Sequence, residues 1–331
     1  MRSPLNWITP HCCMPATPPA SRRSVLGRSG RRRLTSLALL LNVGWAATYP
    51  LSKHVMNGVP PLALTGWRTL IAAVVLLPLL RRSHFPERGT RPGDWLWLTA
   101  IGVVGFALPT ALQYLGTVRT LAANVSLIIG LEPVAVALLA SCVLAERMGP
   151  RMILSFILAF LGVCVISVDL RCVDLISKEH LSGNLLVLAS ILCYAFYTIG
   201  AKKLSPRWGS LPMTGISLAL GAAVFVPGYA LCDPEGFRLG LKLTAWQSVG
   251  IFIIAVPGTA LGYVGWNWLL ARMPLSELSR TLYIQPIAGA LISRWALGEK
   301  LEPTFFLGAG LVLGAISLGR ESAPLREVTR W

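Results

Sequence analysis

Long apolar runs, separated by short polar segments, fill the chain from residue 34 to residue 319. A helix that crosses a bilayer needs roughly 20 mostly apolar residues. Ten runs are close to or above that length, at 34–56, 62–80, 94–116, 121–143, 151–168, 183–203, 211–231, 244–270, 276–297 and 303–319. Glycine and proline inside them are tolerated because neighbouring helices satisfy the backbone. The pattern predicts an all-α integral membrane protein with ten transmembrane helices.

The composition supports this class of protein. Hydrophobic residues make up 54% of the chain and charged residues only 13%, whereas soluble domains carry about 25% charged residues. The mean hydropathy is +0.63. The seven cysteines form no CxxC motif, the four histidines are scattered, and no HExxH motif occurs. We therefore expect neither a metal site nor a cofactor.

The basic residues carry information about orientation. A net charge of +16 would suit a nucleic-acid partner, but the lysines and arginines lie in tails and in loops between apolar runs, so no such partner is predicted. Cytoplasmic loops collect Lys and Arg. One side of the predicted layout collects the N-terminal arginines and then Arg81, Arg82, Arg88, Arg91, Arg147, Arg151, Lys202, Lys203, Arg207 and Arg272. Both termini, including a tail at 320–331, are thus expected in the cytoplasm, with the chain in the plasma or inner membrane.

The stretch at 1–33 forms a segment of its own. It holds five prolines and a run of arginines, and no acidic residue precedes Glu87. Such a composition cannot bury a core, so we predict a disordered basic tail at 1–33. An organelle transit peptide has a similar acid-poor, arginine-rich composition. Under that alternative the protein would lie in an organelle membrane.

An internal repeat divides the chain. One gap-free register aligns 131–138 with 284–291, and a slightly shorter offset aligns Lys53 with Lys202. The repeats are predicted at 34–168 and 183–319, joined by an outer linker loop at 169–182. Each holds five spans, an odd number, so the second must enter the membrane upside down. Inverted repeats place a shared cavity at the midplane and support alternating access.

The residues of the repeat also carry a resemblance to a known family. It rests on short motifs in a fixed order, namely Gly44-Trp45-Ala46, Lys53, Pro60-Pro61, Arg68, Ala72-Ala73, Pro133–Glu146 and the echo of that stretch at Pro286–Glu299. In this order they resemble the EamA family of the drug/metabolite transporter superfamily, over about residues 34 to 319. The resemblance implies a ten-helix inverted-repeat carrier, of a kind that usually exports amino acids or other metabolites.

Glu132 is the sharpest candidate for chemistry. It falls near the middle of the span at 121–143, where a charge costs a few kcal/mol. It should face the cavity, where it could accept a proton during part of the cycle. The alternative is a neutral glutamic acid that braces the helix break made by Pro133. Its counterpart in the second repeat is Gln285, which forms hydrogen bonds but does not titrate.

Arg68 and a set of neutral groups complete the candidates. Arginine cannot shed its charge, so Arg68 either binds a substrate carboxylate, pairs with an acid, or snorkels to the outer headgroups. Cavities for small ligands combine aromatic walls with a few polar groups, although some of the neutral residues must face headgroups or pack between helices. This set is Trp45, Tyr49, Gln113, Tyr114, Asn124, Ser126, Tyr194, Tyr197, Trp266, Asn267 and Tyr283.

These observations predict a permease that moves a small polar metabolite such as an amino acid, with export as the direction. Protons are a candidate coupling partner through Glu132. Small-residue faces at Gly258/Gly262 and Gly310/Gly314 suit close helix packing, including a possible homodimer.

Two other functions fit the chain less well. Carriers of phosphorylated sugars or nucleotide-sugars share this architecture but rely on a Lys/Arg cluster in the ninth span, where this chain has Arg280 near one end. An intramembrane enzyme or a non-transporting sensor is a different class of protein. The chain lacks GxSxG and grouped intramembrane acids, and no signalling domain is attached, so both are disfavoured.

Overall fold

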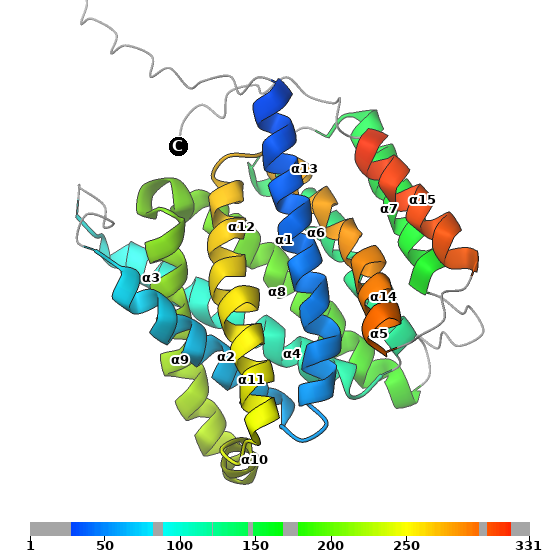
Figure 1. Ribbon diagram of the computed structural model, residues 1–331. Helices are drawn as coiled ribbons and strands as arrows, with labels where there is room; N and C mark the ends of the chain where they lie inside the picture. Colours follow the sequence, from blue (N-terminus) through cyan, green and yellow to red (C-terminus); the bar gives the residue numbers. More distant parts are fainter. Residues whose placement is uncertain are drawn as a thin grey trace, which may run out of the picture.

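The computed structural model describes residues 28–81, 89–120, 122–144, 148–167, 178–297 and 303–318 (Figure 1). Within these ranges every regular element is a helix. The predicted tail is corrected at its boundary, because the first helix begins at Arg28 and residues 28–33 are helical. The linker is corrected in the same way, since residues 178–182 already belong to a helix. Residues 1–27, 168–177 and the C-terminal tail at 320–331 lie outside the described ranges.

The first half contains both continuous and interrupted helices. The continuous ones are α1 (Arg28–Val55), α2 (Pro61–Leu76), which ends in the short η1 (Leu77–Leu79), and α7 (Pro150–Ser167). One interrupted rod runs from α3 (Pro92–Ala100) through the π-helix η3 (Ile101–Ala107) to α4 (Leu108–Thr117). Another consists of α5 (Ala122–Ile129) and α6 (Glu132–Leu144).

The second half has the same design. Its continuous helices are α8 (Lys178–Trp208), α9 (Ser210–Cys232) and α15 (Pro303–Leu318), and the short α10 (Pro234–Gly240) follows α9. One interrupted rod runs from α11 (Ala245–Ile253) through the π-helix η4 (Ile254–Leu261) to α12 (Gly262–Leu270). The other passes from α13 (Leu275–Ser279) through the 3₁₀ turn η5 (Arg280–Tyr283) to α14 (Ile284–Leu297).

The helical ranges correspond to the predicted apolar runs, and seven of them are long and apolar enough to cross a membrane, counted over the described residues. Shorter apolar helices occupy Pro150–Val165 and Thr304–Leu318. A π-helix inside an α-helix, or a 3₁₀ turn in mid-helix, often marks a functional site or hinge. The interruptions therefore point to the rods built from η3 and η4, and to those that begin with α5 and α13.

The repeat is visible in where the elements begin. Helix α2 begins at Pro61 and α9 at Ser210, the same separation as between Lys53 and Lys202. Helices α7 and α15 are separated by the same offset that aligns 131–138 with 284–291, and so are the two π-helices η3 and η4. An irregular element that recurs at the sequence offset of the repeat indicates that the two halves fold alike.

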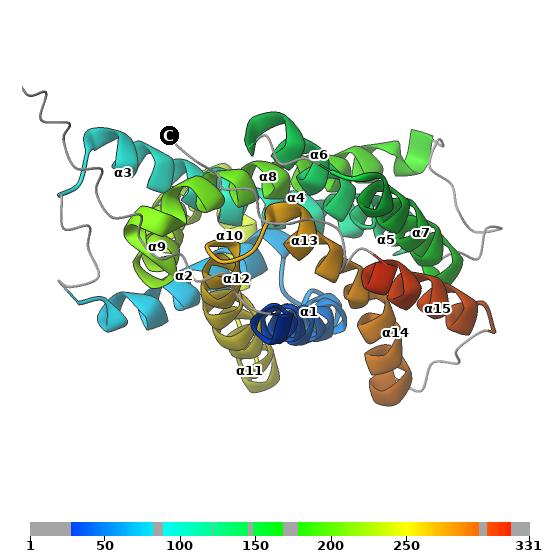
Figure 2. The same ribbon diagram turned by 90° about the horizontal axis from the view of Figure 1, so that it is seen from above.

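The bundle brings equivalent helices of the two halves together. Helix α2 packs against α9, and α7 packs against α15. Figure 2 shows the α7–α15 pair at one edge of the bundle and α3 and α9 at the other. Between these edges α1 packs against α14, and α8 packs against α4 and α6. One apolar core cluster extends from α3 into this region and includes Leu98, Tyr197 and Trp208, all nearly fully buried.

Two glycines let η3 and α9 cross with their backbones in contact. A methyl group on Gly102 would overlap the carbonyl oxygen of Ser217 and lie 2.7 Å from the backbone nitrogen of Gly221. Because backbone atoms cannot move aside, Gly102→Ala should destabilise the protein by roughly 1–3 kcal/mol. The measurement is the thermal unfolding midpoint of purified protein in detergent.

Gly44→Ala is the matched control for that substitution. Gly44 also lies inside a helix, but a methyl group there would meet no atom within 4 Å. Its midpoint should stay at or above that of the native chain, because alanine is the better helix former. Equal midpoints for Gly102→Ala and Gly44→Ala would contradict the close crossing.

Candidate functional site

The bundle encloses a small polar cavity between the two halves. Its walls come from α1, α2, α4, α6, α8, α12, η5 and α14. The lining residues are Trp45, Thr48, Tyr49, Ser52, Arg68, Gln113, Tyr114, Glu132, Tyr194, Tyr197, Thr198, Tyr263, Trp266, Leu282 and Gln285. The cavity has a volume of about 70 Å³, whereas ligand pockets usually enclose roughly 300–1,000 Å³. In this conformation the site is contracted, so a metabolite requires its walls to move.

Arg68 brings a permanent positive charge into the cavity. Its Nε donates to Thr259 Oγ1 at 3.0 Å and its Nη1 donates to the hydroxyl of Tyr114 at 2.9 Å. The guanidinium also lies 5.9 Å from the centre of the Tyr114 ring, within the range of a cation–π contact. The alternative that Arg68 snorkels to the headgroups is therefore wrong. No acidic partner is found for it in the described part of the chain.

The support for Arg68 depends on the π-helix η4. The Thr259 hydroxyl donates to the carbonyl of Ile254, five residues back, at 2.9 Å, and its oxygen accepts from Arg68. On the other side, the Tyr114 hydroxyl is hydrogen bonded to Ser52 at 3.0 Å. Arg68 on α2 is thus tied to η4, α4 and α1 at once. A guanidinium held in this way is oriented before any ligand arrives.

Glu132 lies where the rod of α5 and α6 is interrupted. Helix α5 ends at Ile129 and Glu132 is the first residue of α6, so the break precedes Pro133 as the sequence suggested. The Glu132 side chain is half-buried and lines the cavity. It forms no hydrogen bond or ion pair with any described residue. A carboxyl group without a partner is costly to keep charged inside a protein, so it is available to a ligand or a proton.

Gln285, the counterpart of Glu132, has the opposite environment. Its Oε1 accepts from the Tyr49 hydroxyl at 3.1 Å, and its Nε2 donates to Asn42 Oδ1 at 2.7 Å. Asn42 in turn donates to Thr281 Oγ1 at 3.0 Å. This network satisfies both ends of the Gln285 amide. The two halves of the cavity therefore differ in titratable chemistry and also in how firmly their central side chain is held.

Aromatic rings form most of the remaining wall. Trp45 lies 5.4 Å from Tyr263 and 5.5 Å from Trp266 between ring centroids. Its indole nitrogen donates to the carbonyl of Gly258 in η4 at 2.6 Å. Tyr49 is 39% exposed, in contrast to the buried Tyr263 and Trp266.

Four predicted residues lie outside the cavity wall, and one of them is Ser126, a half-buried residue of α5. Asn267 is buried between Tyr197, whose hydroxyl donates to it at 2.7 Å, and Thr214, to which it donates at 2.8 Å. Asn124 is buried and donates to Thr120 at 3.0 Å. Tyr283 is buried among the apolar residues between α7 and α15. Asn267, Asn124 and Tyr283 therefore join helices to one another.

Five lining residues were missed by the sequence analysis: Thr48, Ser52, Thr198, Tyr263 and Leu282. For α1 the spacing of residues along the sequence could have identified the missed ones. Trp45, Thr48, Tyr49 and Ser52 have the spacing of one helix face, so two predicted members of that face imply the other two. Tyr263 lies three residues before Trp266, which is the same kind of signal.

The cavity places groups of both charges in one lining. It offers a fixed cation, an unpaired carboxyl group and hydroxyl, amide and aromatic groups. Among the described residues no group of histidine, cysteine and acidic side chains is able to hold a metal ion.

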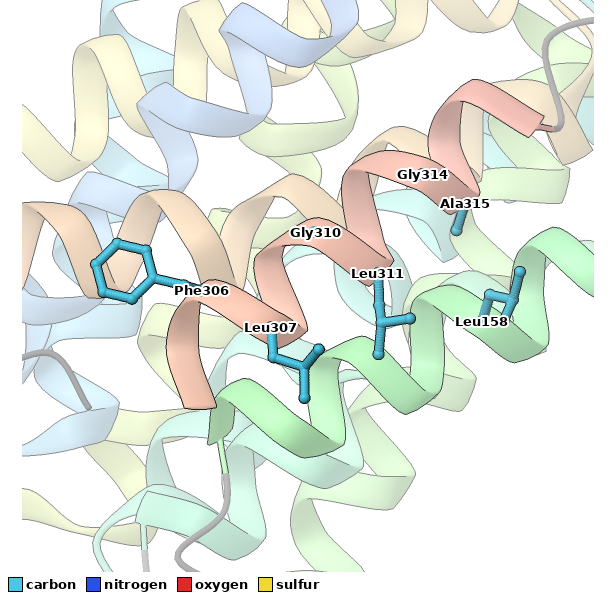
Figure 3. Close-up of a pocket in the computed structure, with 7 residues that line it drawn as sticks. All are labelled: Leu158, Phe306, Leu307, Gly310, Leu311, Gly314 and Ala315. Carbon is cyan, nitrogen blue, oxygen red and sulfur yellow. The ribbon is translucent and has the colours of Figure 1, made fainter. Parts of the chain in front are cut away.

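A second hollow lies on the edge of the bundle and has a different lining. It has a volume of about 330 Å³ and is bounded by Leu158, Phe306, Leu307, Gly310, Leu311, Gly314 and Ala315 (Figure 3). Figure 3 shows these side chains on α15 and the neighbouring α7. None carries a polar group that could orient a metabolite. The polar cavity is therefore the candidate substrate site.

Comparison with known proteins agrees with the arrangement of repeats. The EamA-like transporter family matches residues 34–168 and 181–319. An uncharacterized transporter of Archaeoglobus fulgidus is 26% identical over 283 residues, which cover 85% of this chain and 93% of the relative. A solved crystal structure with 18% sequence identity superposes with a TM-score of 0.70 and covers 88% of this chain and 96% of the other. The latter shows a shared fold.

Two bacterial relatives bear on the class of protein. The uncharacterized transporter YyaM of Bacillus subtilis is 24% identical and covers 81% of this chain and 87% of its own. A probable terminal-alkyne amino-acid exporter of Streptantibioticus cattleyicolor is 24% identical over 282 residues, or 85% of this chain and 91% of the relative. Both matches run through both repeats.

Proposed function

The chain belongs to the EamA-like transporter family, and on that premise we propose that it exports an amino acid by alternating access around the cavity between its two repeats. It is a multi-pass membrane protein. The substrate class is inferred from the cavity. Arg68 and Glu132 both line it, and they form no ion pair with each other.

The proposed layout has ten spans in two inverted repeats. Seven helices are long and apolar enough to cross by themselves. The shorter apolar α7 and α15 and the interrupted rod from α13 to α14 supply the other three. The lysine and arginine bias of the loops supports cytoplasmic termini and a plasma or inner membrane. The recurrence of the π-helix at equivalent positions of the two repeats supports the equivalence of the halves.

The substrate class follows from the charges of the wall. A zwitterion can offer its carboxylate to Arg68 and its ammonium group to Glu132, so each isolated charge finds a partner in the complex. Charge-assisted hydrogen bonds of this kind are roughly twice as strong as neutral ones. The aromatic wall would cover the solute's side chain. Among the residues that line the cavity Arg68 is the only cation, which is too little for a phosphorylated sugar.

The interrupted helices are the elements that would move during transport. The cavity is contracted to about 70 Å³, so binding and release both require the rods that contain η3, η4 and the breaks before α6 and α14 to shift. Broken helices at a midplane site are the usual means by which inverted-repeat carriers open one side at a time. Glu132 would exchange a proton during this movement, as its interaction with the ammonium group of the substrate is made and lost.

The direct test is uptake of amino acids into proteoliposomes with purified protein, with and without a pH gradient. A panel of amino acids, sugar phosphates and polyamines separates the substrate classes. Saturable uptake of at least one amino acid, driven by a gradient that is acidic inside, is the expected result. Uptake of sugar phosphates alone, or of no member of the panel, would refute the proposed function.

A further inference from the structure

Lys53 and Lys202 occupy the same place in the two repeats, but their surroundings differ. The Lys202 ammonium donates to the carbonyl of Leu270 at 2.7 Å and to the carbonyl of Met273. Leu270 is the last residue of α12 and Met273 lies in the turn that follows. Lys53 is exposed and forms no hydrogen bond or ion pair with any described residue. One lysine thus closes a helix end while its equivalent does not.

The carbonyls that Lys202 binds have counterparts in the first repeat. The register that aligns 131–138 with 284–291 carries Leu270 and Met273 onto Thr117 and Thr120. Thr117 is the last residue of α4, as Leu270 is the last of α12, and Thr120 lies in the following turn. The final carbonyls of a helix lack intrahelical partners and carry its negative dipole end, which attracts a lysine. By the repeat register, the carbonyls of Thr117 and Thr120 are therefore the acceptors that correspond to Lys53.

We call the two ends after these residues. The Lys202 end contains Lys202, the start of α1 and the connection from α12 to α13; the Lys53 end contains Lys53 and the connections from α1 to α2 and from α4 to α5. Figure 1 shows the start of α1 and the α12–α13 connection at the same end of the bundle. The interrupted rods run between the two ends.

The Lys202 end is also held by ion pairs between the repeats. Arg31 of α1 forms three hydrogen bonds of 2.6 to 3.0 Å with the buried carboxylate of Glu277 in α13. Arg207 of α8 binds the buried carboxylate of Asp94 in α3 at 2.7 Å. Each pair ties a continuous helix of one repeat to an interrupted rod of the other.

Neither of the equivalent residue pairs at the Lys53 end contains an acidic side chain, so neither repeats these carboxylate contacts. The offsets of the repeat carry Arg31 and Glu277 onto His180 and Asn124, and Arg207 and Asp94 onto Gly58 and Gln247. Gly58 and Gln247 are in contact, because a methyl group on Gly58 would overlap the Gln247 amide. Asn124 is joined to α8 through Thr120 and Asn184 by neutral hydrogen bonds. The Lys202 end therefore holds two ion pairs between the repeats that the equivalent residues of the Lys53 end do not reproduce.

We propose that Lys53 and Lys202 are alternating latches: Lys202 closes its end in the conformation seen here, and Lys53 closes the opposite end, on the carbonyls of Thr117 and Thr120, when the Lys202 end opens. The proposal rests on alternating access as the proposed function. The two ion pairs at the Lys202 end, whose equivalent positions in the other repeat hold no carboxylate, favour the observed conformation as the resting one. A ligand shifts such a balance only through a difference in affinity for the two states.

The test measures which end of the cavity is open, without any substrate. A reporter cysteine replaces Leu282, which lines the cavity, in a full-length chain whose native cysteines are all alanine. A membrane-impermeant maleimide is then added to vesicles of either orientation. Lys202→Met should raise the labelling rate from the Lys202 end by about tenfold, which corresponds to roughly 1.4 kcal/mol. Lys53→Met should lower the rate from that end and raise it from the Lys53 end.

The labelling rate from the Lys202 end should change in opposite directions in Lys202→Met and Lys53→Met. This distinguishes a latch from a structural role, because a bundle that is only destabilised would be labelled faster from both ends. The double variant should return towards the native rates, and Lys202→Arg, which keeps the charge, should stay within about twofold of them. Lys203→Met and Lys242→Met are matched controls, since both lysines are exposed at the two ends and should leave the rates unchanged. Shifts of the same sign for Lys53→Met and Lys202→Met, or no shift, would overturn the latch. Failure to transport any amino acid, with opposite labelling shifts intact, would instead refute only the proposed function.

Discussion

Arg68→Gln should reduce the initial rate of amino-acid uptake at low substrate concentration by about 10- to 100-fold. A hydrogen bond to a charged group contributes roughly 1.5–3 kcal/mol, and about 1.4 kcal/mol is a factor of ten. Glutamine keeps a donor but loses the charge that the substrate carboxylate needs. Because Arg68 is held by Thr259 and Tyr114, Arg68→Lys should recover only part of the rate, since lysine lacks the planar fork of donors. The measurement is uptake of radiolabelled amino acid into proteoliposomes.

A matched control separates the site from the overall charge. Arg272 is exposed, stacks 3.9 Å from the Trp268 ring and lies outside the cavity, so Arg272→Gln should leave uptake unchanged. Thr259→Val removes the acceptor of Arg68 Nε and should cause a smaller loss than Arg68→Gln. If Arg68→Gln transports as fast as Arg272→Gln, the carboxylate site has been assigned to the wrong residue.

Glu132→Gln should abolish the response to a pH gradient while leaving exchange of substrate across the membrane. If the protein exchanges exported substrate for protons that enter the cell, the same exchange in a vesicle couples substrate entry to proton exit. A vesicle that is acidic inside should therefore accumulate substrate. A gradient of about one pH unit could hold about a tenfold concentration ratio at one proton per substrate. The substitution makes Glu132 resemble Gln285, which cannot titrate, so the expected ratio falls to one. The measurement compares accumulation under the gradient with counterflow in its absence.

Counterflow must remain measurable in Glu132→Gln, since its loss would indicate that the side chain is needed for binding itself. Gln285→Asn is a useful comparison, because it shortens the amide that Tyr49 and Asn42 hold without adding or removing a titratable group. It should weaken transport but keep the pH response. A full pH response in Glu132→Gln would exclude this residue as the proton carrier.

The apolar runs located the helices well because membrane spans are defined by length and hydropathy, which are local properties. Their ends were less predictable. The composition of residues 28–33 predicted a disordered tail, but Arg31 pairs with Glu277, which is 246 positions away in the sequence. A contact at that separation cannot be inferred from the composition of the tail. The π-helices were not predicted either: η3 reads as ordinary apolar helix, and in η4 only Pro257, which lacks a backbone N–H donor, marks an interruption.

The repeat register was the most productive inference about the site. It paired Glu132 with Gln285, and both line the cavity. Polarity alone was a weaker guide, as Asn267 shows. This residue is a polar group inside a span, but Tyr197 and Thr214 satisfy its amide, and those partners come from α8 and α9. Whether an intramembrane amide faces a cavity or a neighbouring helix depends on helix packing, which a single sequence does not display.

The central claim is that the cavity recognises a zwitterion by both of its charges. Competition in the uptake assay tests it most directly, with a transported amino acid set against its N-acetyl derivative, its amide and the corresponding decarboxylated amine at equal concentration. The account predicts that the intact amino acid inhibits uptake strongly and that each derivative, which lacks one charge, inhibits at least about tenfold less. If any one of the three derivatives competes as well as the amino acid itself, the claim that Arg68 and Glu132 bind the two ends of the substrate is contradicted.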